Sequence, residues 1–107
     1  MKSDLAELKG EILTAIGHPN RIRIVEFLKG GPKCACEIAP ALHLEQSNLS
    51  RHMKLLIQTG IVHNWKDGKR VMYEIPDKNV FGILDKVSFI LKNMVRNRME
   101  VLEIGNC

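Results

Sequence analysis

A helical pattern that gives way at once to a hairpin pattern restricts the possible folds of this chain most strongly. Residues 45–59 (EQSNLSRHMKLLIQT) predict a helix whose first half is polar or basic. Its apolar residues follow the spacing of one buried helical face: Leu49, Met53, Leu56 and Ile57. Residues 62–66 and 70–75 then predict two strands joined through Asp67 and Gly68, a pair typical of tight hairpins. This order is typical of a winged helix-turn-helix, in which a helix reads bases and a hairpin contacts phosphates.

The rest of the chain predicts helices on both sides of this unit. Residues 4–16 predict a first helix, and Pro19 suits the first turn of a second helix, which ends at the Gly-Gly-Pro of residues 30–32. A short third helix is expected near 36–42, started rather than interrupted by Pro40 if its first turn lies late. Residues 78–104 predict a long last helix. The expected fold class is mainly α with a two-stranded β-wing, a winged helix-turn-helix of order α-α-α-α-β-β-α. We expect residues 1–107 to form one domain.

The last predicted helix is apolar on more of its circumference than one small domain needs to cover. Its main stripe is spaced by three and four residues: Val80, Leu84, Val87, Leu91, Met94 and Val101. Other apolar residues widen this stripe: Phe81, Ile83, Phe89, Ile90, Val95 and Leu102. A helix of this kind is usually buried on two sides, so we expect the first and last helices to form a homodimer interface. The alternative is a terminal helix that packs only on its own domain.

Composition and cysteine content narrow the class of protein. The chain has 16 Lys and Arg residues against 12 acidic ones, a formal charge of +4 that suits a polyanionic partner. Three cysteines are too few for a secreted disulfide scaffold, and no apolar run is long enough for a signal peptide or membrane span. We therefore expect a cytoplasmic location and no membrane partner. No carboxylate pair, nucleophile-base arrangement or glycine-rich phosphate loop indicates an enzyme.

Two groups of residues are predicted to contact DNA. The first lies in the first two turns of the polar helix: Gln46, Ser47, Asn48, Ser50, Arg51 and His52. Gln and Asn pair with adenine, Arg pairs with guanine, and Ser binds phosphates or base edges. Ser47 or Asn48 alternatively caps the helix. His52 is alternatively a locally satisfied or solvent-facing histidine, although its place beside Arg51 favours DNA. The second group consists of cations at the hairpin, suited to phosphate: Lys66, Lys69 and Arg70.

Four segments between residues 16 and 75 resemble the ArsR (arsenical-resistance-repressor) family of winged-helix regulators, in its order and spacing: IGHPNRIRIVEFLK, CACEI, LEQSNLSRHMKLLIQTGIV and WKDGKRVMYEI. The resemblance implies a homodimer that binds a partly palindromic double-stranded DNA operator and leaves it when an inducer binds. It places the family's base-reading positions on the same six helix residues and its wing on residues 66–70. Glu45 departs from the serine often found there. An acid suits a helix N-terminus but repels phosphate, so Glu45 itself is not expected to touch DNA.

Cys34 and Cys36 form a second informative motif. In the irregular start of a helix, both sulfurs could turn toward one soft ion such as As(III), Cd(II) or Pb(II), which thiolates prefer. Alternatively, both are small buried hydrophobic residues. The resemblance favours the first interpretation, because thiol-based members of the family carry a Cys-X-Cys inducer motif at this place. Cys107 is either a third ligand or disulfide partner, or a bystander at a frayed terminus.

Three functions therefore remain open. The first is a repressor released from DNA by a thiophilic metal or metalloid at Cys34 and Cys36. The second is a repressor switched by oxidation of the same thiols, without a metal, through a disulfide between subunits or to Cys107. The third is a ligand-independent DNA-binding protein whose cysteines have no sensing role.

Overall fold

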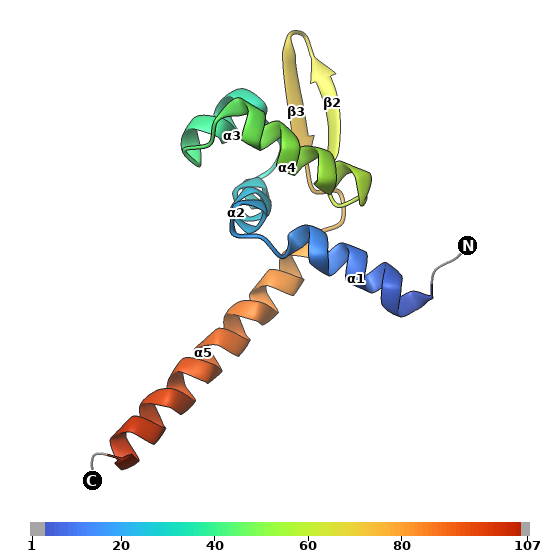
Figure 1. Cartoon of the computed structure of the whole chain (residues 1–107). Coiled ribbons are helices and arrows are strands. Elements are labelled where there is room, and N and C mark those ends of the chain that lie inside the picture. The colour runs from blue at the N-terminus through green and yellow to red at the C-terminus, as the bar shows by residue number, and fades with distance from the viewer. Residues whose placement is uncertain (1–3, 106–107) are drawn as a thin grey trace.

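The computed structural model of the protein describes residues 4–105, and the side chains of residues 4–99. The elements follow one another in this order: α1 (Leu5–Ile16), α2 (Pro19–Phe27), the 3₁₀ turn η1 (Leu28–Gly30), β1 (Lys33–Cys34), α3 (Ala35–Ala41), α4 (Gln46–Gln58), β2 (His63–Asp67), β3 (Arg70–Glu74) and α5 (Asn79–Gly105). The α3–α4 pair and the β2–β3 hairpin lie on one side of the molecule, and α5 extends away from the opposite side (Figure 1). This arrangement is the predicted winged helix-turn-helix.

Local capping explains where the first two helices begin. The Oδ1 atom of Asp4 accepts a hydrogen bond from the Glu7 amide at 2.8 Å, which satisfies a free N–H at the start of α1. The Nδ1 atom of His18 accepts from the Asn20 amide at 3.0 Å and caps α2. Pro19 occupies the first turn of α2 as predicted, because a proline there loses no helical hydrogen bond.

The third helix lies within one residue of the range predicted for it, but the prediction was wrong in the place of Pro40. Helix α3 begins at Ala35, because the side chain of Cys34 and the carboxylate of Glu37 form a reciprocal capping box. Pro40 consequently lies in the last turn instead of the first. The helix ends directly afterwards at Ala41, and His43 two residues later adopts a left-handed φ of 55° of the kind that commonly follows a helix end.

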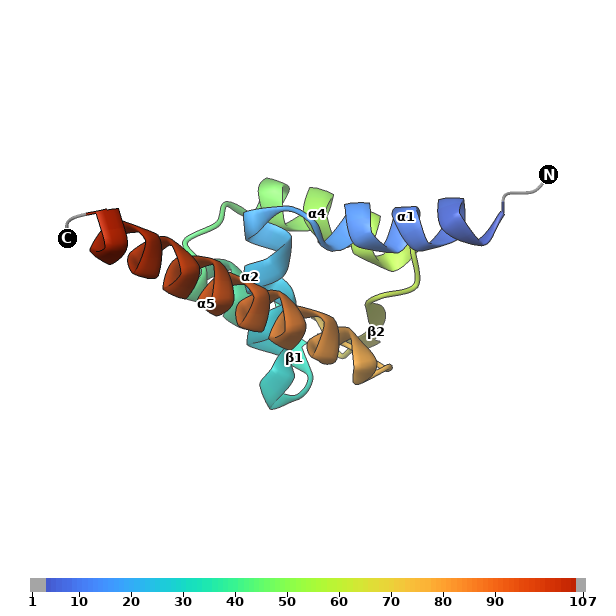
Figure 2. The same cartoon turned by 90° about the horizontal axis from the view of Figure 1, so that it is seen from below.

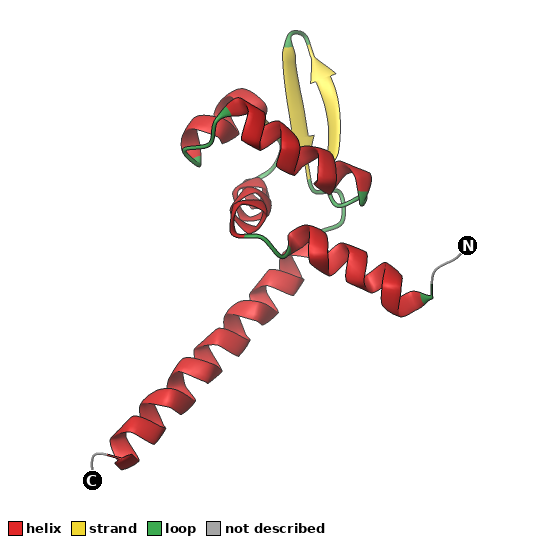
Figure 3. Cartoon of the chain, viewed as in Figure 1, coloured by secondary structure: helices red, strands yellow, loops and turns green. Residues whose placement is uncertain are grey.

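The wing belongs to a three-stranded antiparallel sheet of order β1-β3-β2 rather than to an isolated pair. Strands β2 and β3 pair from His63 opposite Glu74 to Asp67 opposite Arg70, and Gly68 turns the hairpin with a φ of 65° that glycine adopts without strain. Strand β1 pairs with β3 through Cys34 opposite Met72. The cysteine segment is therefore joined by strand pairing to β3 of the hairpin that Figure 3 shows beside α4.

One core lies beneath the helix-turn-helix unit, and two helices leave apolar surface outside it. The core is formed by the end of α1, by α2, α3, α4 and the strands, and by the start of α5. Its least exposed large residues include Ile24, Leu28, Ile38, Met53, Leu56 and Ile75. Helices α1 and α5 instead carry the exposed large apolar side chains, and both project from the body (Figure 2). Within residues 4–105, no helix is both long and apolar enough to cross a lipid bilayer.

Candidate nucleic-acid interface and cysteine pocket

The turn between α3 and α4 fixes the orientation of the polar helix. The amide of Leu44 donates to the carbonyl of Ala39 at 2.9 Å, and the amide of His43 donates to that of Pro40 at 3.2 Å. His43 adopts a left-handed φ of 55°, which reverses the chain within a few residues. Helix α4 then runs beside the β2–β3 hairpin, so that its N-terminal half and the wing lie on the same side of the molecule (Figure 1).

The exposed side of α4 is polar and basic. Gln46, Ser47, Ser50 and Arg51 are exposed, and their spacing places them opposite the buried residues Leu49, Met53 and Leu56 of the same helix. Lys54 is exposed on the same side, three residues after Arg51 and four after Ser50. Lys54 was not among the residues predicted from the sequence, because those came only from the first two turns; the spacing of three and four residues indicates it.

The expected capping role of Ser47 or Asn48 is not observed. Glu45 occupies the N-cap position of α4 and makes no side-chain capping bond. Asn48 is half-buried, and its Oδ1 atom accepts a hydrogen bond from the guanidinium of Arg51 at 2.9 Å. The pair holds two potential base-reading side chains in one geometry on the exposed side of the helix.

His52 does not lie among the exposed DNA contacts, and the prediction from the sequence was wrong at this position. Its side chain is only 5% exposed, on the buried side of α4 together with Met53 and Leu56. Its ring packs against that of His18, with the ring centroids 4.7 Å apart, and its Nδ1 atom lies 3.2 Å from a guanidinium nitrogen of Arg21. Burial lowers the pKa of His52, and the charges of His18, Arg21 and Arg51 lower it further. A neutral, buried imidazole is not placed to contact DNA.

The wing presents three exposed cations, Lys66, Lys69 and Arg70. Arg70 forms an ion pair with Asp67 across the hairpin, with 3.1 Å between Nη2 and Oδ2. Both side chains are more than half exposed, so this pair contributes little to stability but reduces the net charge that Arg70 offers. Lys66 and Lys69 make no ion pair with any residue that the structure describes.

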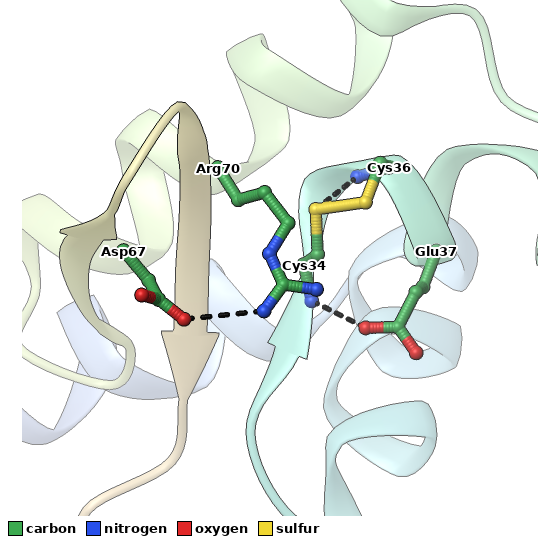
Figure 4. A network of polar contacts seen from close by, with 5 residues as sticks. All are labelled: Cys34, Cys36, Glu37, Asp67 and Arg70. Carbon is green, nitrogen blue, oxygen red and sulfur yellow. Dashed lines mark hydrogen bonds and ion pairs between the residues drawn. A yellow bond between two sulfur atoms is a disulfide. The ribbon is translucent and has the colours of Figure 1, made fainter.

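Cys34 and Cys36 are brought together as expected from the sequence, but their surroundings differ. Cys34 is only 2% exposed, whereas Cys36 is exposed, and the two sulfurs form a disulfide (Figure 4). The Cys34 amide donates to the Glu37 carboxylate at 2.9 Å, and the Cys36 amide donates to the Cys34 sulfur at 3.0 Å. The bond therefore lies within one chain, between residues two apart in the sequence, and the disulfides expected between subunits or to Cys107 stay predictions. Cys107 itself lies outside the described residues.

The cysteine motif and the candidate DNA surface share one pocket of about 230 Å³. Its lining combines both sulfur-bearing residues with the first residue of α4 and the wing cations: Cys34, Ala35, Cys36, Gln46, Lys69, Arg70 and Val71. Figure 4 shows the Arg70 side chain between Asp67 and the cysteine pair. A ligand held by the two sulfurs would therefore lie against side chains that are predicted to contact DNA.

The ligand set available for a metal ion is small. Within the described part of the chain, no group of three or more His, Cys, Asp and Glu residues is placed to hold one ion. Glu37 is occupied as the acceptor of the Cys34 amide. After reduction, Cys34 and Cys36 alone offer two thiolates, which suit a soft ion of low coordination number rather than a tetrahedral zinc site.

Comparisons with known proteins agree with this fold. Residues 18–64 match the profile of the family described as "Bacterial regulatory protein, arsR family". The chain is 35% identical over 86 residues to the HTH-type transcriptional repressor SmtB of Mycobacterium tuberculosis, covering 79% of this chain and 64% of that repressor. It therefore spans somewhat less than two thirds of the length of that relative.

Two further proteins match over most of their length. An uncharacterized HTH-type transcriptional regulator of M. tuberculosis, Rv0081, is 32% identical over 100 residues, covering 92% of this chain and 88% of that protein. Its crystal structure superimposes with a TM-score of 0.81 at 29% identity, covering 92% of this chain and 99% of the other. The homodimeric winged helix-turn-helix domain Mb0332 from Mycobacterium bovis has a TM-score of 0.77 at 21% identity, covering 90% and 93% of the two chains, and supports the fold alone.

Proposed function

The chain belongs to the ArsR family of bacterial regulatory proteins, and from this premise we propose that it is a DNA-binding transcriptional repressor. Helix α4 enters the major groove, and the following residues face the bases and their phosphates: Gln46, Ser47, Asn48, Ser50, Arg51 and Lys54. The wing cations Lys66, Lys69 and Arg70 bind the backbone. The related proteins are named as transcriptional regulators and not as enzymes, in agreement with the prediction from the sequence.

We propose that the protein acts as a homodimer on a partly palindromic operator. The exposed large apolar side chains of the structure are confined to two helices, α1 and α5: Leu5, Leu8, Ile12, Leu13, Val87, Phe89, Ile90, Leu91, Met94, Val95 and Met99. Apolar surface of this extent is stabilised when a second subunit covers it. Two copies related by a two-fold axis would present two α4 helices to successive major grooves, which requires an operator of matching symmetry.

The shared pocket carries the proposal that a thiophilic ion releases the protein from DNA. Cys34 lies on β1, which is hydrogen-bonded to wing strand β3, and the pocket beside it includes Gln46, Lys69 and Arg70. Two thiolates drawn onto one soft ion would move the base of the wing and the start of α4 together. This movement shifts both ends of the DNA-contacting surface and weakens its fit to each half-site. A small displacement of the wing and α4 is therefore sufficient to reduce the affinity for the operator.

Oxidation of the same thiols is the second candidate, because the two sulfurs are bonded in the structure. The step converts two thiols into one disulfide and gives up two protons and two electrons to an oxidant such as diamide. It acts on the same segment and requires no metal. In this candidate, the reduced form binds DNA and the disulfide form does not.

One parallel titration tests these candidates. A duplex is first selected from a random library by the reduced protein, and its binding is then measured during addition of As(III), Cd(II), Zn(II) or diamide. We expect a soft ion to weaken binding by about 5–150-fold, the range of typical allosteric coupling. Loss of duplex binding with diamide but with none of the metal ions favours the redox switch. No response to any agent contradicts both candidates and leaves a ligand-independent regulator.

The control is a double variant, Cys34→Ser with Cys36→Ser. Serine is a preferred N-cap residue, so it retains the cap that Cys34 provides to α3. This variant is expected to bind the duplex as the wild type does, without response to ions or oxidant. Cys107→Ser should reduce the response only if the third thiol takes part. Dissociation of the double variant on challenge would place the sensor elsewhere in the chain.

A further inference from the structure

One guanidinium group joins the end of α1 to the buried side of α4. The Nε atom of Arg21 donates to the carbonyl of Ala15, and Nη2 donates to the carbonyl of Thr14 at 3.4 Å. Both carbonyls lie in the last turn of α1, where helical partners are missing and a cation is favourable. The third nitrogen, Nη1, lies 3.2 Å from Nδ1 of His52 on α4.

The hydrogen-bond partners define the protonation state of both histidines in this cluster. A guanidinium has donors only, so the Nδ1 atom of His52 must be the unprotonated acceptor, and its proton is on Nε2. The Nδ1 atom of His18 accepts from the Asn20 amide at 3.0 Å, which requires the same neutral tautomer. The two rings are in contact, 4.7 Å between centroids. A proton added to Nδ1 of His52 removes the acceptor of the Arg21 hydrogen bond.

The basic side chains near His52 make its protonation unfavourable. Arg21 and His18 approach it from the start of α2, and Arg51 from α4 itself. Helix α1 contributes the neutral carbonyls that Arg21 bonds, and its acidic residues Glu7 and Glu11 line a neighbouring pocket with Leu55 and Thr59 of α4. Burial is the largest cause of its lowered pKa, followed by the charges of His18, Arg21 and Arg51. A protonated His52 would place an N–H against an N–H and one positive charge against another, so Arg21 and His52 would separate.

We propose that Arg21, His18 and His52 form a proton-sensitive junction that positions α4 relative to α1, so that acidification selectively weakens sequence-specific DNA binding. The proposal rests on α4 as the helix that reads DNA and adds a function to residues that do not touch DNA. Because α1 is part of the proposed dimer interface, the junction connects the position of each α4 to the spacing between the two subunits.

The test compares specific and random DNA over the range in which histidines titrate. Affinity for the selected duplex and for a random duplex is measured from about pH 8 to about pH 5.5 at constant ionic strength. General protonation strengthens phosphate binding to both duplexes, so their ratio isolates the specific component. We expect the ratio to fall toward the acidic end by less than about tenfold, because an ordinary histidine pKa of about 6.5 would give about tenfold at about pH 5.5 and the pKa of His52 is lower. A ratio that is constant with pH would overturn the proposal.

Two matched substitutions identify the residue responsible. In His52→Asn, the amide oxygen can accept from Arg21 in place of Nδ1 and cannot be protonated in this range. This variant should bind at about pH 8 within about threefold of the wild type and show a flat ratio. His43→Asn makes the same chemical change at an exposed turn residue whose left-handed φ suits asparagine, and should retain the wild-type profile. A pH-dependent loss that persists in His52→Asn contradicts the junction.

A measurement without DNA separates this proposal from the proposed function. Long-range ¹H–¹⁵N spectra of the wild type near neutral pH should show the Nε2–H tautomer for His52, and His52 should gain its proton below the ordinary histidine value of about 6.5. If no duplex can be selected at all, the proposed function fails while these spectra still test the junction. A proton on Nδ1 of His52 near neutral pH, or a pKa of His52 at or above about 6.5, would overturn the junction by itself.

Discussion

Arg51 tests whether α4 reads bases or only clamps phosphates. Its guanidinium donates to Asn48 at 2.9 Å on the exposed side of α4, which orders the side chain before DNA arrives. We expect Arg51→Ala to weaken binding to the selected duplex by about 1–3 kcal/mol and to reduce the preference for particular bases. Anisotropy titrations on the selected duplex and its single-base variants measure both effects.

Arg23 provides the matched control for this substitution. It is exposed on α2 and donates to Asn20 at 2.8 Å, the same three-residue pairing away from the proposed interface. Arg23→Ala should leave specific and random binding unchanged. If Arg51→Ala reduces the affinity for specific and random DNA by the same factor, Arg51 contacts phosphate and does not read a base.

The position of His52 shows where sequence patterns fail at the scale of single residues. A run of polar residues predicted one exposed side, yet the helical spacing places His52 with Met53 and Leu56 beneath that side. The burial of His52 is tolerated because the guanidinium of Arg21, 31 positions earlier in the sequence, supplies a hydrogen-bond partner for its imidazole. A partner so distant in the chain leaves no local pattern, whereas the exposed residues Gln46, Ser50 and Arg51 followed from periodicity alone.

The lowered pKa of His52 predicts how the stability of the protein depends on pH. Between this lowered pKa and about 6.5, the unfolded chain binds more protons than the folded one. The free energy of unfolding should therefore decrease as the pH falls below about 6.5 and reach a plateau below the folded pKa. Urea denaturation at several pH values measures the effect, and the decrease should be smaller in His52→Asn. If the free energy of unfolding decreases equally in both proteins, its pH dependence comes from groups other than His52.

At the scale of elements, β1 changes the interpretation of the cysteine motif. Two residues are too few to show the alternation that identifies a strand, so the sequence predicted a two-stranded wing. In the structure, β1 places Cys34 opposite Met72 of β3, and the buried sulfur lies beside the wing rather than only before the polar helix. The helices and the hairpin turn were predictable because each has a local signal: periodicity, a proline at the first turn, or an Asp-Gly pair.

The wing as an element should act on affinity but not on sequence preference. Lys69 is exposed and makes no ion pair with the residues described, whereas Arg70 is paired with Asp67. Lys69→Ala should weaken all duplexes alike and reduce the slope of log affinity against log salt by about 0.9. Arg70→Ala should reduce the slope less, because Asp67 already neutralises part of its charge. Salt titrations with Lys29→Ala, an exposed lysine of η1 that lines a pocket with the start of α5, provide the control. An unchanged slope in Lys69→Ala contradicts the phosphate contact.

At the scale of the whole molecule, the amphipathic patterns predicted which helices leave apolar surface uncovered. The core of the described chain closes over the first two turns of α5, at Val80, Phe81 and Leu84, and the later apolar residues of α5 remain exposed. The sequence indicated this excess because the apolar stripe is wider than a single packing side. It could not indicate which residues pack within one subunit, since that depends on where α5 leaves the body of the fold (Figure 2).

Leu91 tests the proposed dimer most directly. It lies near the middle of the exposed stripe on α5 and is 56% exposed in the single chain, so a charged residue there is tolerated by the subunit itself. Burial of a carboxylate in an apolar interface is strongly unfavourable without a partner. Leu91→Glu should therefore produce folded monomers in sedimentation experiments and lose tight binding to the selected duplex at the same time.

Phe89 is the matched control, because it is 57% exposed and lies about 200° around the helix from Leu91. If the dimer uses the side of α5 that contains Leu91, Phe89→Glu should remain a dimer and retain tight binding. Two variants with equal exposure and equal added charge then differ only in the side of the helix that they occupy. A wild-type protein that is monomeric at micromolar concentration contradicts the interface. Dissociation of both variants instead indicates that the partner subunit surrounds α5 on both sides.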